Sequence, residues 1–215
     1  MLKQFVRSAA LSVMLFSSFS AVANSNSSDE ARASLQARLA TMQSLQADFA
    51  QTVTDQQGEL MQQLHGRFAL ARPNLLYWQT DAPDETVMIA DGSALWYYNP
   101  FVEQVSVYDQ TDSMAQSPLL LLVDAESPAW ADYQVSYENN SYALQPLPNS
   151  DARQSLQLVF GDADSSQLQR IILDDGQGQL STIELEAVQL NGTIADDLFR
   201  FKLPAGVELD DQRGG

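Results

Sequence analysis

Along most of the chain, hydrophobic and polar residues alternate with a period of two, which predicts β-strands with one buried side. The alternation begins near Ala47 and recurs in about eleven short runs, and turn signals such as Asp91-Gly92 separate neighbouring runs. The runs lie at residues 47–53, 68–78, 86–90, 94–98, 104–108, 133–137, 142–145, 156–160, 168–173, 183–187 and 199–203. This spacing predicts an antiparallel meander, and so many twisted strands in one sheet should make it curl.

A helical period precedes the first strand. Ser27 and Glu30 have the spacing of a capping box, which marks a helix start. An apolar stripe at helical spacing follows, made of Ala31, Leu35, Leu39 and Met42. The pattern predicts an ordinary amphipathic helix over about residues 28–43.

Residues 109–132 interrupt the strand pattern. Ser117-Pro118 is a favourable helix start, because serine caps helices well and proline suits their first turn. Five consecutive apolar residues, Leu119 to Val123, follow before Asp124. We expect a helical segment of about two turns, and a helix that is apolar all round must be covered on every side. Trp130 is expected to be a core residue.

Several strands are apolar on both sides. A two-residue Asp91-Gly92 turn would pair Ile89 with Ala94 and Val87 with Trp96. One face would then carry Val87, Ile89, Trp96 and Tyr98, and the other would carry Met88, Leu95 and Tyr97. A sheet with one wet face shows cleaner alternation, so both surfaces need covering. Either helices cover the sheet, or a curved sheet holds an apolar ligand on its concave side.

The N-terminus has the pattern of a secretory signal peptide. Lys3 and Arg7 precede an apolar stretch, and Ala21-Val22-Ala23 matches a cleavage site. The stretch is too short and too broken by serines for a membrane anchor, which is the alternative reading. We expect residues 1–23 to be cleaved, leaving residues 24–215 as a single domain exported to a bacterial periplasm.

Composition narrows the possible chemistry. The 215 residues include 11 Lys+Arg, 28 Asp+Glu, one His and no Cys, and the formal net charge is −17. Such a charge disfavours binding to nucleic acid or to anionic lipid. Without cysteine there is no thiol nucleophile or lipid attachment site, and His65 alone makes no multi-histidine metal site. We expect His65 to be exposed at a strand end, and we expect no cofactor and no metal.

Five motifs, in order along residues 30–213, resemble those of the LolA family of periplasmic outer-membrane lipoprotein carriers. They are Phe49-x-Gln51, Gly66-x-Phe68-x-Leu70-x-Arg72-Pro73-Asn74-Leu75-x-x-Trp78, Asp91-Gly92-x-x-Leu95-Trp96-x-Tyr98-Asn99-Pro100-Phe101-Val102-Glu103-Gln104, Phe199-x-Phe201-x-x-Pro204-x-Gly206-Val207 and Asp210-Asp211-Gln212-Arg213. Each motif alone is weakly specific, whereas five in register are highly specific.

The resemblance implies a mainly β fold with helices, namely an unclosed antiparallel β-barrel of about eleven strands with an α-helical lid. It implies a monomeric carrier that shields the acyl chains of lipoproteins. Such a carrier receives them from an ATP-driven inner-membrane complex and passes them to an outer-membrane receptor, which is itself a lipoprotein. The chain has no phosphate-binding loop of its own, so the ATP chemistry would belong to the partner.

Arg72 is the most informative single residue. In a strand without a bulge it would share one face with apolar residues, and a guanidinium there needs acceptors. The matching arginine of the family latches the lid in the empty state, so the resemblance gives Arg72 this role; a surface ion pair is the alternative. Some members of the family carry an aromatic residue at the position of Leu76, which is smaller. The expected cavity and lid residues are Phe68, Leu70, Arg72, Leu76, Trp78, Met88, Trp96, Leu119, Leu120 and Leu122.

Two other functions compete with the carrier. The first is an exported hydrolase with paired carboxylates, for which Asp84, Glu85 and Asp91 beside aromatic strands are the candidates. Turn and solvation roles explain all three, and no G-x-S-x-G motif is present, so we expect no enzyme. The second is a periplasmic module that senses lipids or lipoproteins, although such proteins usually carry a second domain.

Overall fold

The computed structural model describes residues 23–161 and 167–214, and in this part of the chain twelve strands form one sheet. The helical elements are α1 (Ala23–Thr41), α2 (Gln110–Gln116) and the 3-10 helices η1 (Pro118–Leu122), η2 (Pro128–Asp132) and η3 (Asp196–Phe199). The strands are β1 (Ser44–Thr54), β2 (Leu60–Ala71), β3 (Leu75–Thr80), β4 (Thr86–Asp91), β5 (Ala94–Asn99), β6 (Gln104–Asp109), β7 (Tyr133–Glu138), β8 (Ser141–Pro146), β9 (Ser155–Phe160), β10 (Leu168–Asp174), β11 (Leu180–Leu190) and β12 (Glu208–Asp211).

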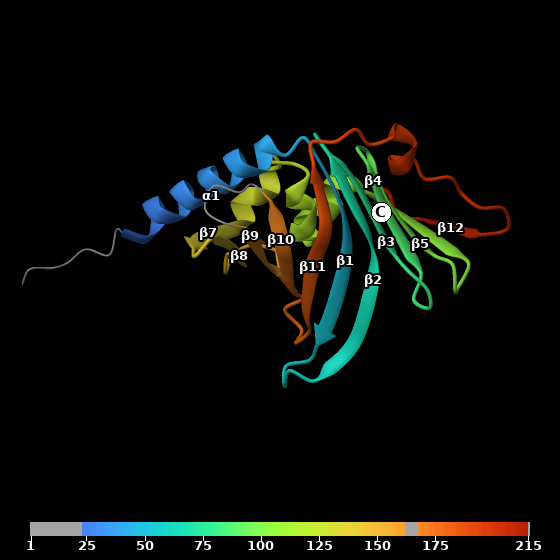
Figure 1. Cartoon of the computed structure of the whole chain (residues 1–215), viewed down its shortest axis with the longest axis horizontal. Helices are drawn as coiled ribbons and strands as arrows, with labels where there is room; N and C mark the ends of the chain where they lie inside the picture. The colour runs from blue at the N-terminus through green and yellow to red at the C-terminus, as the bar shows by residue number, and fades with distance from the viewer. Residues whose placement is uncertain (1–22, 162–166, 215) are drawn as a thin grey trace, which may run out of the picture.

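The sheet has the order β12-β6-β5-β4-β3-β2-β1-β11-β10-β9-β8-β7. All neighbours pair antiparallel except β12, which runs parallel to β6. The sheet is strongly bent, and α1 runs across one end of it (Figure 1). Because β12 and β7 stand at opposite ends of the order, the sheet is unclosed. The predicted fold class is confirmed, with twelve strands rather than about eleven.

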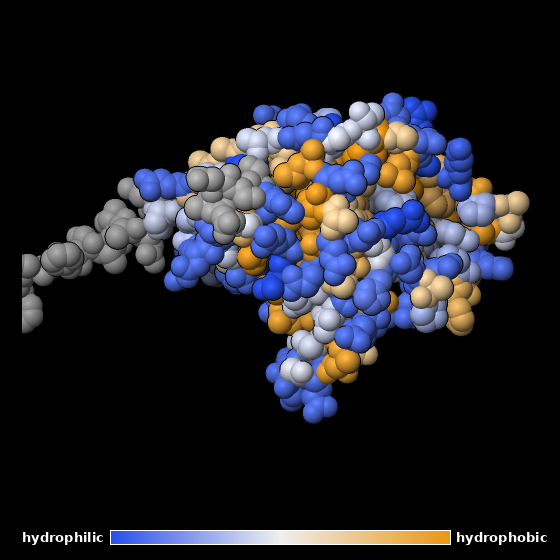
Figure 2. Space-filling model, viewed as in Figure 1, coloured by the Kyte–Doolittle hydropathy of each residue, from blue (hydrophilic) through white to orange (hydrophobic). Residues whose placement is uncertain are grey.

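One side of the sheet, here called the inner face, packs against α1 and η1. Leu35, Leu39 and Met42 of α1 have no exposed surface and belong to one apolar cluster with the side chains of the inner face. The apolar stripe of α1 and the inward-pointing side chains of the strands therefore form a single core. On the side of the molecule drawn in Figure 2, hydrophilic residues cover most of the surface, with hydrophobic residues between them in its middle.

The C-terminal segment covers part of the opposite side, here called the outer face. Phe199 ends η3 and is buried, and η3 lies beside β3 and β4. The strand predicted at 199–203 is therefore wrong, because this segment packs its aromatic residues over the sheet instead of pairing in it. The last strand is β12, which adds to the edge at β6.

Two predicted registers also differ from the structure. The run at 68–78 is a hairpin, because the chain turns after β2 and Phe68 pairs with Trp78. In the β4–β5 hairpin the turn residues are Gly92 and Ser93, so Ile89 pairs with Trp96 rather than with Ala94. Gly92 has a φ of 98°, which suits glycine at the first position of such a turn. The predicted division of residues between the two faces is nevertheless correct.

The N-terminal helix is longer than expected. It begins at Ala23, so Ser27 lies inside it and the predicted capping box is wrong. The rest of the predicted signal peptide lies outside the described residues. Among the described helices, none combines the length and hydropathy needed to span a membrane. Trp130 is buried as expected, and His65 is exposed, although it lies within β2 rather than at a strand end.

Candidate functional site

The inner face is built from rows of side chains that pair across neighbouring strands. In the row of β2 to β5 nearest the β2–β3 turn, Leu70, Leu76, Ala90 and Leu95 lie side by side. The next row contains Phe68, Trp78, Met88 and Tyr97. Phe68, Leu70, Leu76 and Trp78 are all less than 10% exposed, whereas Met88 is only partly buried. The first two rows therefore form an apolar surface without a charged side chain.

An aromatic group extends this surface onto β1. The ring centroids of Phe49 and Trp78 are 4.1 Å apart, and those of Phe68 and Trp78 are 5.5 Å apart. Gly66 makes room for this group, because a Cβ there would lie 2.7 Å from the Phe49 ring. It would also lie 1.9 Å from the Gln79 carbonyl oxygen, so any side chain at position 66 would collide with backbone.

The η1 helix covers the apolar rows. Its residues Pro118 to Leu122 are all buried, and Val123 after it has no exposed surface. The predicted lid residues Leu119, Leu120 and Leu122 thus lie in the same apolar cluster as Phe68, Leu70, Leu76 and Trp78. In this conformation the side chains of α1 and η1 occupy the inner face, and the cover consists of these two elements, which we call the lid.

Arg72 fastens the two parts of the lid to the sheet. It lies in the β2–β3 turn, and its Nε donates to the carbonyl oxygens of Leu39 (3.0 Å) and Met42 (3.1 Å) at the end of α1. Its Nη1 donates to the Val123 carbonyl oxygen (3.0 Å) and its Nη2 to that of Leu122 (2.9 Å), at the end of η1. The helix-end acceptors that Arg72 was expected to need are present. Its release on loading stays a prediction.

The electrostatic setting of Arg72 is unusual for an arginine. Burial lowers the pKa of its guanidinium, and the nearby Asp124 carboxylate partly opposes this shift. An arginine nevertheless remains charged in proteins, because its pKa starts so high. Its acceptors are carbonyl groups at helix C-termini, where the helix dipole favours a positive charge. Hydrogen bonds to a charged group contribute about 1.5–3 kcal/mol each, so the four hydrogen bonds of Arg72 make a strong polar link between the sheet and the lid.

Sequence reasoning missed a polar link beside Arg72. Gln110, at the start of α2, is only 2% exposed. Its Nε2 donates to the Asn74 carbonyl oxygen (2.8 Å), and its Oε1 accepts from the Gly92 backbone N–H (2.9 Å). The Asn74 amide in turn donates to the Gly92 carbonyl oxygen (3.2 Å). Gln110 therefore ties the turn that carries Arg72 to the helix that leads into η1.

A second missed residue holds the end of α1. Asn191, after β11, accepts at its Oδ1 from the Gln43 backbone N–H (2.7 Å) and donates from its Nδ2 to the Thr41 carbonyl oxygen (3.2 Å). It has a φ of 56°, a conformation that asparagine tolerates better than most residues. Nothing in the local pattern identifies Gln110 or Asn191, because their partners lie far away in the sequence.

Trp96 was predicted to line the cavity, but it lies outside the site. It pairs with Ile89 and lies on the outer face, away from Met88 and Trp78. Its ring stacks on Phe201 at 5.2 Å between centroids. The odd and even positions of a strand face opposite ways, so Trp96 and Met88, which lie one position out of step across the β4–β5 pair, cannot share a face. The remaining predicted residues lie at the inner face or in its lid.

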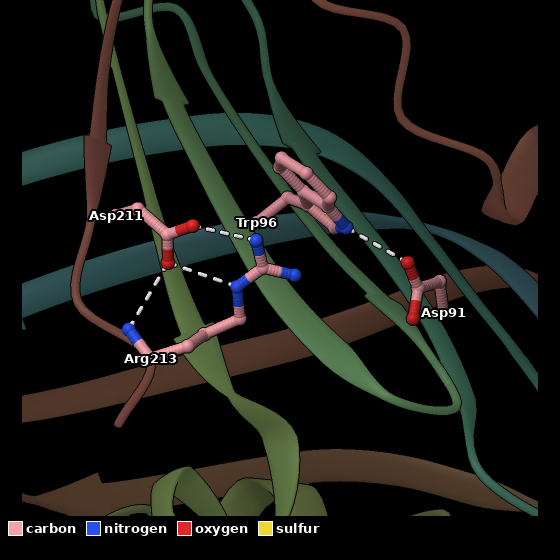
Figure 3. Close-up of polar contacts among 4 residues, drawn as sticks. All are labelled: Asp91, Trp96, Asp211 and Arg213. Atoms are coloured by element: carbon pink, nitrogen blue, oxygen red, sulfur yellow. Dashed lines mark hydrogen bonds and ion pairs between the residues drawn. The ribbon is translucent and has the colours of Figure 1, made fainter.

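The surroundings of Trp96 fix the C-terminus to the sheet. Its Nε1 donates to the Asp91 carboxylate at 2.8 Å, and the Arg213 guanidinium lies 5.8 Å from the Trp96 ring centre. Figure 3 shows these side chains together with Asp211. Arg213 also donates to Asp211 through Nε (2.9 Å) and Nη2 (2.6 Å). Burial tends to raise the pKa of Asp91, but hydrogen bonds from Ala94, Trp96 and Ser93 outweigh it and hold that pKa below its usual range.

The carboxylates proposed for a hydrolase are divided between the two ends of β4, with Asp84 and Glu85 before it and Asp91 at its end. A strand advances about 3.3 Å per residue, so five steps along β4 separate its ends by about 17 Å. Paired carboxylates of glycosidases lie about 5–9.5 Å apart. Within the described residues, no group of three or more His, Asp or Glu side chains could hold a metal ion.

Comparison with known proteins gives a consistent result. The model of the family described as outer membrane lipoprotein carrier protein LolA matches residues 40–202. The outer-membrane lipoprotein carrier protein of Idiomarina loihiensis is 41% identical over 207 residues, which cover 96% of this chain and all of that protein. That of Shewanella halifaxensis is 39% identical over 212 residues, covering 99% of this chain and 98% of that protein.

A solved structure is similar in fold. It is that of an uncharacterized conserved protein from Thermus thermophilus, with a TM-score of 0.50 at 12% identity. The match covers 86% of this chain and 98% of that one. At this identity the likeness supports the fold alone.

Proposed function

This chain belongs to the family of outer membrane lipoprotein carrier proteins, LolA, and on that premise we propose that it shields lipoprotein acyl chains against its inner face while crossing the periplasm. It would receive lipoproteins from an ATP-driven complex of the inner membrane and deliver them to a receptor at the outer membrane. Members of this family are carriers and not enzymes, which agrees with the wide separation of Asp84 and Asp91.

The observation that carries the proposal is Arg72 bound to four carbonyl groups of a lid over an apolar surface. If the lid swings away, the two rows of apolar side chains from β2 to β5 become available to a ligand. An acyl chain of about 15 methylenes gains about 12 kcal/mol when buried, and three chains would exceed the limit of about 20 kcal/mol observed for non-covalent binding.

The lid lowers the net affinity of the carrier for acyl chains. In the closed state, Leu39, Leu120 and Leu122 already cover the inner face, so an acyl chain replaces one apolar contact with another. Only the difference between the two sets of contacts favours loading. A carrier needs this balance, because it must both take up its cargo and release it.

The test uses a synthetic triacylated lipopeptide and the same peptide without acyl chains. We expect the carrier to bind the lipopeptide one to one in native mass spectrometry and calorimetry, and not to bind the bare peptide. Met88 and Val87 offer a matched pair of variants, since both are partly buried neighbours on β4 that face opposite sides.

Met88→Glu should weaken lipopeptide binding at least tenfold, because it places a charge where an acyl chain would lie. Val87→Glu, on the outer face, should bind like the unmodified protein. Equal binding of the acylated and bare peptides, or equal losses in the two variants, would contradict the proposal.

A further inference from the structure

The polarity of the inner face changes along the strands. The two rows nearest Arg72 are apolar, whereas the third row contains Gly66, Thr80 and Thr86, with Asn99 two residues beyond Tyr97 on β5. Successive rows are two residues apart, which is about 6.6 Å along a strand. The inner face therefore passes from apolar to hydroxyl and amide side chains within about 13 Å of the lid end.

An open recess of about 560 Å³ lies at the polar end, and we call it the mouth pocket. Leu64, Thr80, Thr86, Tyr97 and Asn99 contribute to its wall from the inner face, together with residues of the β3–β4 loop. The Thr80 hydroxyl donates to the Asp84 carbonyl oxygen (2.6 Å) and accepts from the Thr86 backbone N–H (2.8 Å), which fixes this loop against the sheet. The wall of the mouth pocket is thus built and hydrogen-bonded, unlike a loose surface hollow.

The mouth pocket also carries negative charge. Asp84 and Glu85 line it, both are exposed, and neither forms an ion pair within the described part of the chain. Arg67, on the neighbouring strand, points to the outer face, where it donates to Gln79. The two carboxylates are therefore not neutralised from the sheet beneath them.

Along a lipoprotein, apolar and polar groups follow one another in the same order as the side chains along the inner face. Its acyl chains are apolar, its glyceryl ester and amide groups are polar without charge, and the polypeptide begins beyond them. We propose that the mouth pocket receives this junction between acyl chains and polypeptide, and that Asp84 and Glu85 favour cargo with a basic residue next to the acylated cysteine. The inference rests on the proposed function and adds a preference among its cargoes.

Charge on the cargo gives the proposal a direct test. Two triacylated lipopeptides would be compared that differ only in the residue after the acylated cysteine, lysine in one and glutamate in the other. At low salt we expect the carrier to bind the lysine lipopeptide at least fivefold more tightly. The preference should shrink at 1 M salt, where charges are screened beyond about 3 Å.

Two double variants locate the effect. Asp84→Asn with Glu85→Gln removes the charge of the mouth pocket and leaves the Asp84 carbonyl oxygen that holds the loop. Glu186→Gln with Glu208→Gln removes the same charge from exposed residues outside the mouth pocket. The preference for lysine should fall towards one in the first variant and persist in the second.

The outcomes separate the two proposals. If neither lipopeptide binds, the carrier function fails and the mouth pocket proposal falls with it. If both bind with equal affinity, or if the two double variants lose the preference equally, the carrier function stands and the mouth pocket proposal is overturned. The recess would then be left to a partner protein, for which exposed Phe101 on its rim provides an apolar contact.

Discussion

At the residue scale, the position of Arg72 suits arginine better than lysine. The guanidinium is planar and has five N–H donors, so one side chain reaches acceptors on both α1 and η1. A lysine ammonium is a point charge with three donors on a flexible stem and would not hold this arrangement as well. The acceptors are carbonyls rather than carboxylates, so opening the lid leaves no buried carboxylate unpaired, a defect that costs several kcal/mol.

We predict that Arg72→Leu folds and loads but releases cargo poorly. The change removes charge-assisted hydrogen bonds from the empty state, each contributing about 1.5–3 kcal/mol. It also adds apolar surface that contributes about 1.5–3 kcal/mol if buried against an acyl chain. Since about 1.4 kcal/mol is a tenfold change, transfer of a purified lipoprotein to the receptor should shift by about a hundredfold or more.

The control for Arg72 is Arg67→Leu. Arg67 lies on β2, the strand before the turn that carries Arg72, but it is exposed, and its guanidinium donates to Gln79 away from the lid. This variant should load and transfer like the unmodified carrier. Normal transfer by Arg72→Leu would show that Arg72 does not act as a latch.

At the scale of elements, the η1 part of the lid is held more firmly at its ends than in its middle. The segment before η1 is fixed by the Asp109 cap of α2 and by Gln110. The segment after η1 is fixed by Trp130, whose Nε1 donates to the Asp124 carbonyl oxygen (2.9 Å). Between them, η1 has 3-10 hydrogen bonds from the Leu120 N–H to the Ser117 carbonyl oxygen (3.1 Å) and from the Val123 N–H to the Leu120 carbonyl oxygen (3.2 Å). It is otherwise held by apolar contacts and by Arg72. We expect η1 to open before the strands do.

We predict that Gln110→Leu speeds hydrogen exchange of the amides at residues 119–123 by about tenfold. The change leaves the Gly92 N–H and the Asn74 carbonyl oxygen without their partner, which loosens the turn that carries Arg72. Exchange in the strand around Trp96 should change much less. The measurement is native-state exchange followed by mass spectrometry.

Thr80→Val is the matched control. Thr80 is a comparably buried polar residue, and it holds the β3–β4 loop at the end of β3 that lies away from Arg72. It should lower overall stability without a selective effect on η1. In an Arg72→Leu background, Gln110→Leu should lose its selective effect on residues 119–123. If the effect persists there, Gln110 supports the fold but does not position Arg72.

At the scale of the whole molecule, both edges of the unclosed sheet are protected. The β7 edge lies under α1, since the Val135 N–H donates to the Ser28 hydroxyl (3.0 Å) and Arg32 donates to the Tyr133 carbonyl oxygen (2.8 Å). The β12 edge is only four residues long and largely acidic. Short, charged or covered edges discourage pairing between molecules, and a net charge of −17 adds repulsion.

We therefore predict that the carrier is a monomer in solution. Sedimentation velocity should give one species near the mass of a single chain, at low salt and again at 1 M salt. If the protein remains a monomer at high salt, protection of the sheet edges is sufficient without charge repulsion. A dimer that forms when the repulsion is screened would indicate that an edge or the rim at Phe101 remains available for association.

Local pattern was sufficient to predict most of the strands and the division of residues between the two faces, but not the hairpin within residues 68–78 or the last strand, β12. The β4–β5 turn shows why the division was predictable: it lies one residue later than expected, which moves each cross-strand partner by two positions. Because side chains alternate with a period of two, Met88 and Ile89 keep their faces despite the shift. The apolar run at 119–123 likewise predicts its own burial, since no side of it is polar.

Which face becomes the inner one was decided by tertiary structure. Met88 and Trp96 look alike as half-buried strand residues, and only the covers, the lid on one side and the C-terminal segment on the other, separate them. Tertiary structure also decided which polar groups bind one another. Arg72 binds residues 30 to 51 positions away, and Gln110 binds Asn74 across 36 positions. Periodicity describes the environment of a side chain, whereas hydrogen-bond partners depend on how distant segments meet in three dimensions.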